Sequence, residues 1–104
     1  MPKSCETTTL PKALLGDENE AIAHLCKALG NSSRVKILKI LIAEGTCLSG
    51  DLAENFDLAQ STVSEHLRLL KEAGLIQGTI DGPRRSYCVN DAALKLLKQH
   101  IKAL

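Results

Sequence analysis

A cluster of hydrogen-bonding side chains opens a segment whose later residues repeat with helical spacing. The segment runs from position 58 to 75 and reads LAQSTVSEHLRLLKEAGL. Amide and hydroxyl side chains can bind base edges and phosphates, and the amides of a helix N-terminus add a phosphate contact. Because the later apolar stripe would anchor such a helix, its polar end is suited to the DNA major groove. The candidate DNA-contacting residues are Gln60, Ser61, Thr62, Ser64, His66 and Arg68.

Two features qualify this prediction. Glu65 lies within the same segment and would repel phosphate, so it either reads cytosine or turns away from the duplex. The polar turn can also be interpreted as an ordinary helix cap on a solvated surface.

A second basic site follows a turn signal. Asp81-Gly82-Pro83 separates two stretches, 75–80 and 84–90, in which the apolar period is about two, and Asp-Gly favours a hairpin. Arg84 and Arg85 come directly after this turn. From the tip of a hairpin they could reach the DNA backbone or minor groove. The alternative is a solvated pair of charges.

The four cysteines are widely spaced and form no CxxC or CxC pair, which predicts free thiols in a reducing compartment. If the short bridge at 46–48 pairs with the second strand at 87–89, Cys47 lies opposite Cys88, within disulfide range. This pair is a candidate dithiol switch or two ligands of a soft-metal site. Cys26 falls on an apolar helical stripe and is expected to pack in the core. We find no nucleophile–base pair or phosphate loop and expect no enzyme activity.

The surrounding pattern predicts one small domain, mainly α with a β-hairpin wing. Residues 1–16 are expected to form a flexible N-terminal arm, and residues 17–104 a winged helix-turn-helix domain. Its five helices are expected at 18–29, at 32–44, from Ser49, at 60–73 and from about Asp91. The first and last helices carry apolar stripes beyond what a small core requires, so we expect them to form a homodimer interface.

The charge is less favourable to DNA binding. The net charge is +1, whereas nucleic-acid-binding domains are often strongly basic. A protein-interaction module of the same fold, without DNA affinity, is therefore an alternative. The chain has no run of 18 apolar residues and no signal-peptide core, so we expect a cytoplasmic protein with no membrane contact.

With these elements in place, the sequence resembles the ArsR/SmtB family of winged-helix repressors. The resemblance is carried by LGNSSRVKILKIL at 29–41, LAQSTVSEHLRLLKEAGLI at 58–76 and DGPRRSYCVN at 81–90. It implies a homodimeric repressor that leaves operator DNA when an inducer binds. Zinc-sensing relatives use ligands on the last helix, but Asp91 and His100 lie half a turn out of phase there, so zinc is not expected.

The cysteines fit the family's thiol sites better. Arsenic-sensing relatives have a thiol pair at the start of the third helix, where this chain keeps Cys47 alone. Other relatives combine N-terminal and third-helix thiols, which correspond to Cys5 and Cys47. We therefore expect an arsenite-like inducer, arsenite, antimonite or another thiophilic metal ion, at Cys47, Cys88 and Cys5, and no cofactor for DNA binding. The alternative is a repressor that senses oxidants or reactive sulfur through Cys47 and Cys88.

Overall fold

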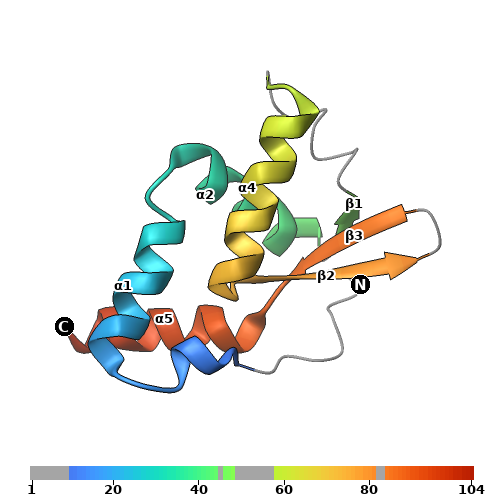
Figure 1. Ribbon diagram of the computed structural model, residues 1–104. Coiled ribbons are helices and arrows are strands. Elements are labelled where there is room, and N and C mark those ends of the chain that lie inside the picture. The colour runs from blue at the N-terminus through green and yellow to red at the C-terminus, as the bar shows by residue number, and fades with distance from the viewer. Residues whose placement is uncertain (1–9, 45, 49–57, 82–83) are drawn as a thin grey trace.

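The structure is a computed structural model that describes residues 10–44, 46–48, 58–81 and 84–104, with the backbone alone at 46–48, 79–81 and 84–85. Its helices and strands confirm a mainly helical winged fold (Figure 1). Four of the five expected helices are present, and the expected third helix, from Ser49, falls in the segment 49–57, outside the described residues. The elements are η1 (Lys12–Leu14), α1 (Glu18–Ala28), α2 (Ser32–Glu44), β1 (Thr46–Leu48), α4 (Gln60–Ala73), β2 (Ile76–Asp81), β3 (Arg84–Val89) and α5 (Asp91–Ala103).

Short polar side chains begin three of these helices. Asp17, Asn31 and Asn90 each use a side-chain oxygen to accept a backbone N–H of the first turn of α1, α2 and α5. Such caps satisfy amides that have no partner within the helix. At α2, Asn31 Oδ1 accepts from Ser33 at 2.9 Å and from Arg34 at 3.2 Å.

Gly74 ends α4 in a left-handed conformation, with φ of 89°. Its N–H donates to the carbonyls of Leu70 and Lys71, which closes the helix before β2. The N-terminal segment packs against this point, because a Cβ on Gly74 would overlap Pro11 Cγ and lie 3.0 Å from Pro11 Cδ. The predicted stop is therefore confirmed and has a packing reason as well as a conformational one.

The three strands form one antiparallel sheet in the order β1-β3-β2. In the β1–β3 pair, Thr46 lies opposite Cys88 and Cys47 lies opposite Tyr87. The expected register, with Cys47 opposite Cys88, is therefore wrong by one residue. Alternating burial normally fixes a register, but here Cys88 (1 % exposed) and Val89 (6 %) are both buried, so the sequence alternation carries no such signal.

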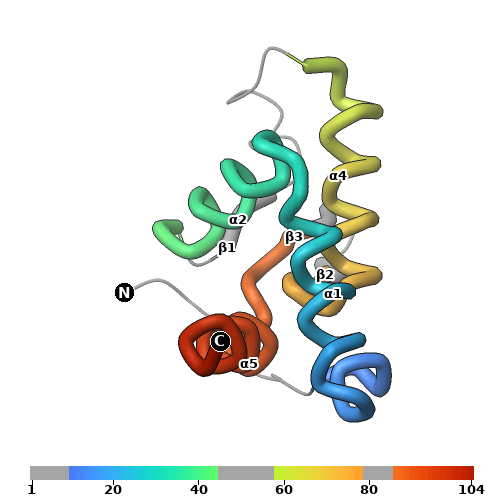
Figure 2. The backbone as a smooth tube through the Cα atoms, turned by 90° about the vertical axis from the view of Figure 1, so that its left-hand side faces the viewer, coloured from blue at the N-terminus to red at the C-terminus, as the bar shows by residue number. Residues whose placement is uncertain are grey.

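The core lies between the helices and the sheet: α2 and α4 contact the strands, and α1 packs against α4 and α5 (Figure 2). The core face of α1 is Ala21, Leu25 and Ala28, so the expected stripe is right for Leu25 but wrong in including Cys26. Cys26 is exposed in this protomer, so the expectation that it packs in the core is wrong. The two alanines and Leu25 form an equally regular stripe at helical spacing. Within the described part of the chain, no helix is long and apolar enough to cross a membrane.

Candidate nucleic-acid interface

Helix α4 has one face buried in the core and one face exposed to solvent. Val63, Leu67, Leu70 and Ala73 are buried and face the core. Five of the six predicted DNA-contacting residues of α4 lie away from that stripe, whereas His66 is half-buried at its margin. The structure thus brings one group of polar side chains together on an exposed surface of a fixed helix. The exposed members are Gln60, Ser61, Thr62, Ser64 and Arg68.

The first turn of α4 begins at a residue that cannot cap it with its side chain. Its N-cap residue is Ala59, and among the described residues no side chain makes a capping hydrogen bond there. The interpretation of Ser61, Thr62 and Ser64 as a capping turn is therefore wrong, and capping does not occupy their hydroxyls. An N-terminus of this kind presents backbone amides and the positive end of the helix dipole, which favour an anion such as phosphate.

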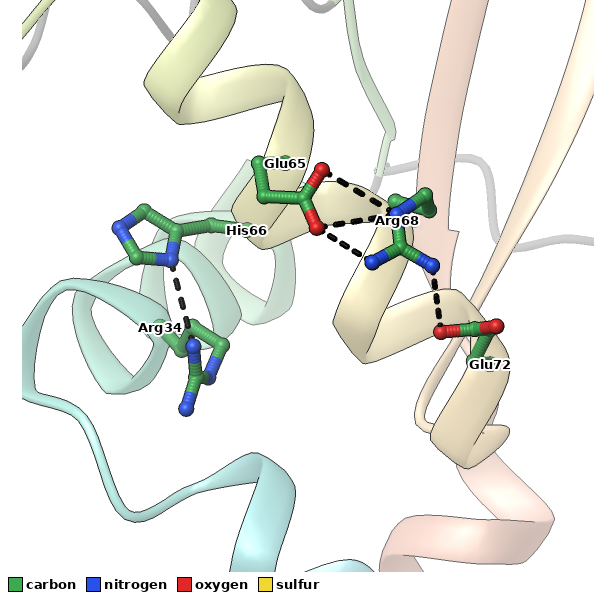
Figure 3. Close-up of polar contacts among 5 residues, drawn as sticks. All are labelled: Arg34, Glu65, His66, Arg68 and Glu72. Carbon is green, nitrogen blue, oxygen red and sulfur yellow. Dashed lines mark hydrogen bonds and ion pairs between the residues drawn. The ribbon is translucent and has the colours of Figure 1, made fainter.

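Arg68 is held by two carboxylates on the exposed side of α4 (Figure 3). Its Nε and Nη2 donate to the Glu65 carboxylate, and its Nη1 donates to Glu72 Oε2 at 2.8 Å. The hydrogen bond from Arg68, aided by its charge, lowers the pKa of Glu65, and the same contact raises the pKa of Arg68. Glu65 is therefore exposed and forms an ion pair with a predicted DNA-contacting arginine. Its reading of cytosine stays a prediction.

A second contact joins α4 to the start of α2 (Figure 3). Arg34 Nε donates to the carbonyl of Ala28 at 2.6 Å, and Arg34 Nη1 lies 3.4 Å from His66 Nδ1. Arg34 thus connects the end of α1, the beginning of α2 and the middle of α4. Sequence reasoning did not select Arg34 as a functional residue. Its one signal is a cation in the first turn of a helix, where the dipole disfavours it unless it has partners.

The wing residues lie apart from the α4 group. Arg84 and Arg85 begin β3, where they pair with Asp81 and Ile80 at the end of the hairpin that is farthest from α5 (Figure 1). Their backbone positions confirm that they follow the hairpin turn. Their contact with DNA stays a prediction.

The cysteines are only partly described. Cys88 is buried and disulfide-bonded, whereas Cys26 is a free thiol. The expectation of free thiols throughout is therefore wrong for Cys88, since folding can join thiols that are far apart in sequence. Its bonding partner lies outside the described side chains, as do Cys5 and the side chain of Cys47. Within the residues that are described, no group of three His, Cys, Asp or Glu could hold a metal ion.

Comparison with known proteins identifies the family. A family model described as "Bacterial regulatory protein, arsR family" matches residues 31–77. The chain is similar to the HTH-type transcriptional regulator CmtR of Mycobacterium tuberculosis, with 38 % identity over 71 % of this chain and 62 % of that regulator. The match thus spans less than two thirds of the mycobacterial protein. The arsenical resistance operon repressor of Staphylococcus aureus is 31 % identical over 80 % of this chain and 79 % of its own length.

A solved structure shows the same architecture. The solution structure of a homodimeric winged helix-turn-helix DNA-binding domain from Mycobacterium bovis is 28 % identical, with a TM-score of 0.69. The superposition covers 79 % of this chain and 76 % of that domain. Its similarity supports the assignment of the hairpin β2–β3 as a wing beside α4. By sequence and by fold, the chain belongs to the arsR family of bacterial regulatory proteins.

Proposed function

We propose that the protein is a homodimeric transcriptional repressor that inserts α4 into the major groove of operator DNA. The observation that carries this proposal is α4 itself, with base- and phosphate-binding side chains exposed along a helix whose other face is buried. Relatives from Staphylococcus aureus and Bacillus subtilis are named as repressors. Arg84 and Arg85 would add contacts from the wing.

The dimer would form through α1 and α5. These helices pack together, and His100 Nδ1 lies 3.0 Å from Glu18 Oε1 between them. Ile101 and Leu104, at the end of α5, are exposed apolar side chains in the single protomer. Covering them in a dimer would remove apolar surface from water, and the similar domain from Mycobacterium bovis is homodimeric. A two-fold dimer predicts a near-palindromic operator with half-sites roughly 34–36 Å apart.

The inducer we favour is a thiophilic metalloid or metal such as arsenite, bound by Cys5, Cys47 and Cys88 as thiolates. Relatives are named for arsenical and cadmium resistance, which supports this class of ligand. Binding would release DNA if the ion prefers a dimer shape that mismatches the operator. Cys88 would have to be reduced before it could take part.

The Cys88 disulfide favours a second candidate, a repressor that responds to oxidants or reactive sulfur. Two thiols would lose two hydrogens to a peroxide, which would be reduced to water, and a disulfide would form. Cys88 and Cys47 would supply the two thiols. In this candidate the protein is still a DNA-binding repressor, and only the signal that releases it from DNA is different.

One experiment tests these proposals together. Duplexes are selected from a random pool, and the reduced protein's complex is then challenged with arsenite, antimonite, cadmium, zinc, lead and peroxide. The favoured inducer predicts release by arsenite or antimonite and loss of that response in Cys47→Ser and Cys88→Ser, with Cys26→Ser as the matched control. Release by peroxide, with a mass loss of two hydrogens, would favour the second candidate. Release by zinc alone, unaffected by either substitution, would overturn both the metalloid and the oxidant candidates. Failure to select any duplex would indicate a protein-interaction module.

A further inference from the structure

The outermost ridge of α4 is acidic as well as polar. Positions 61, 65, 68 and 72 are spaced by four, three and four residues, which places them on one side of a helix. All four are exposed, opposite the buried stripe of Val63, Leu67 and Leu70. Two of the four, Glu65 and Glu72, carry negative charge. Carboxylates on a helix face that approaches DNA repel the phosphates. They can favour binding only if they interact with another group, such as a cation or a base.

Both carboxylates act on Arg68 in the free protein (Figure 3). Three of its nitrogens already donate to them: Nε and Nη2 to Glu65, and Nη1 to Glu72. Ion pairs as exposed as these are weak and easily exchanged. The duplex could therefore take Arg68 away from its partners, but the carboxylates would then face the nucleic acid without their cation.

We propose that Glu65 is a specificity-determining residue that makes binding by Arg68 conditional on a cytosine in the operator. This inference rests on the proposed DNA-binding function. When Arg68 turns to a phosphate or base, the Glu65 carboxylate needs a new donor. The amino group of cytosine is the base-edge donor that best matches a carboxylate in the major groove. A duplex without cytosine at that position leaves Glu65 unpaired and repelled by phosphate.

Glu72 has a different part in this arrangement. It lies seven residues beyond Glu65, about 10 Å along the helix axis. It bonds to Arg68 through the opposite nitrogen of the guanidinium. Glu72 therefore restrains the arginine and lowers affinity for any duplex, whereas Glu65 also reads a base. The two glutamates can be told apart because only one of them changes base preference.

The test is a random-pool selection with the full chain carrying Glu65→Gln, followed by affinity measurements on selected and random duplexes. Glutamine pairs with adenine, so one position in each half-site should change from cytosine to adenine. Affinity for random duplex should rise about two- to fivefold, since a weak ion pair and a repulsive charge are removed. Glu72→Gln should raise random-duplex affinity similarly and leave base preference unchanged. Glu44→Gln makes the same charge change at an exposed position at the end of α2 and should change neither.

Circular dichroism and the oligomeric state of each variant establish that the fold is kept. The inference is overturned if Glu65→Gln selects the same sequence with the same ratio of selected to random affinity. It is also overturned if Glu72→Gln alone changes the base preference. If the wild-type protein selects no duplex, the proposed DNA-binding function fails together with this inference. If it selects one and Glu65→Gln behaves like the Glu44 control, only the role of Glu65 fails.

Discussion

Replacing Gly74 with alanine should destabilise the fold for two separable reasons. The residue has φ of 89°, and an L-residue in the left-handed region costs about 1–2 kcal/mol. Its new Cβ would also overlap Pro11 Cγ, and overpacking of this kind costs about 1–3 kcal/mol. The two effects together predict that Gly74→Ala lowers the free energy of unfolding by about 2–5 kcal/mol.

Urea unfolding followed by circular dichroism measures this loss, with all variants at one protomer concentration because dimerisation adds to apparent stability. Gly16→Ala is the matched control, since Gly16 has no positive φ and a Cβ there meets nothing within 4 Å. It should change stability by less than about 1 kcal/mol. Adding Pro11→Ala to Gly74→Ala removes the overlapping ring atoms and leaves the Cβ atoms of positions 11 and 74 at an ordinary 3.4 Å. The double variant should recover the stability lost to overpacking but not the loss due to the left-handed φ. Equal stability of Gly74→Ala and Gly16→Ala would refute the reasoning.

Three further outcomes follow from single contacts. Asn90→Ala removes the side-chain cap from α5, where Asn90 Oδ1 accepts from Ala93 at 3.2 Å, and should cost at least about 1 kcal/mol in urea unfolding. Leu67→Ala empties a fully buried position of α4 and should cost about 2–5 kcal/mol; a loss near zero would contradict the core assignment. Because Arg68 lowers the pKa of Glu65, carboxyl NMR should find a higher pKa in Arg68→Gln. Because the pKa of Glu65 is lower in the folded protein, the ion pair stabilises the fold at pH values above the unfolded pKa. This stabilisation is lost as the pH falls through the folded pKa. An unchanged pKa of Glu65 in Arg68→Gln would exclude the ion pair in solution.

The fold was predictable where the determining signals are local. Asn31 caps α2 and Gly74 ends α4 through contacts within a few residues, so the sequence near each site was sufficient. The hairpin followed from the change of apolar period after Gly74 and from its turn residues. These signals depend on backbone conformation and are little affected by distant packing.

Features that depend on distant partners were not predictable in the same way. The core face of α1 includes the alanines at positions 21 and 28. Their burial depends on where the neighbouring helices lie, which the local sequence does not specify. The register of Cys88 was ambiguous because both faces of β3 are covered there. The contact between Arg34 and His66 joins residues 32 apart, and no local pattern specifies it.

The candidate site divides along the same line. Side-chain types and helical spacing were enough to place the polar group of α4 on an exposed surface. The pairing of Arg68 with Glu65 and Glu72 could not be predicted from side-chain types and spacing alone. Several residues lie within one turn of Arg68, and the side-chain rotamers decide which of them it contacts. The predicted thiol site combined residues whose association depends on tertiary structure.

The most direct test of the central claim measures the affinity of the dimer for its selected duplex before and after the polar end of α4 is removed. The variant replaces Gln60, Ser61 and Ser64 with alanine, which leaves the buried stripe intact. We predict one dimer per duplex and at least a roughly tenfold loss of affinity in the variant, with unchanged circular dichroism, since each base contact of this type is worth about 1–3 kcal/mol. Equal affinity of the folded variant and the wild type would contradict the assignment of α4 as the DNA-reading helix.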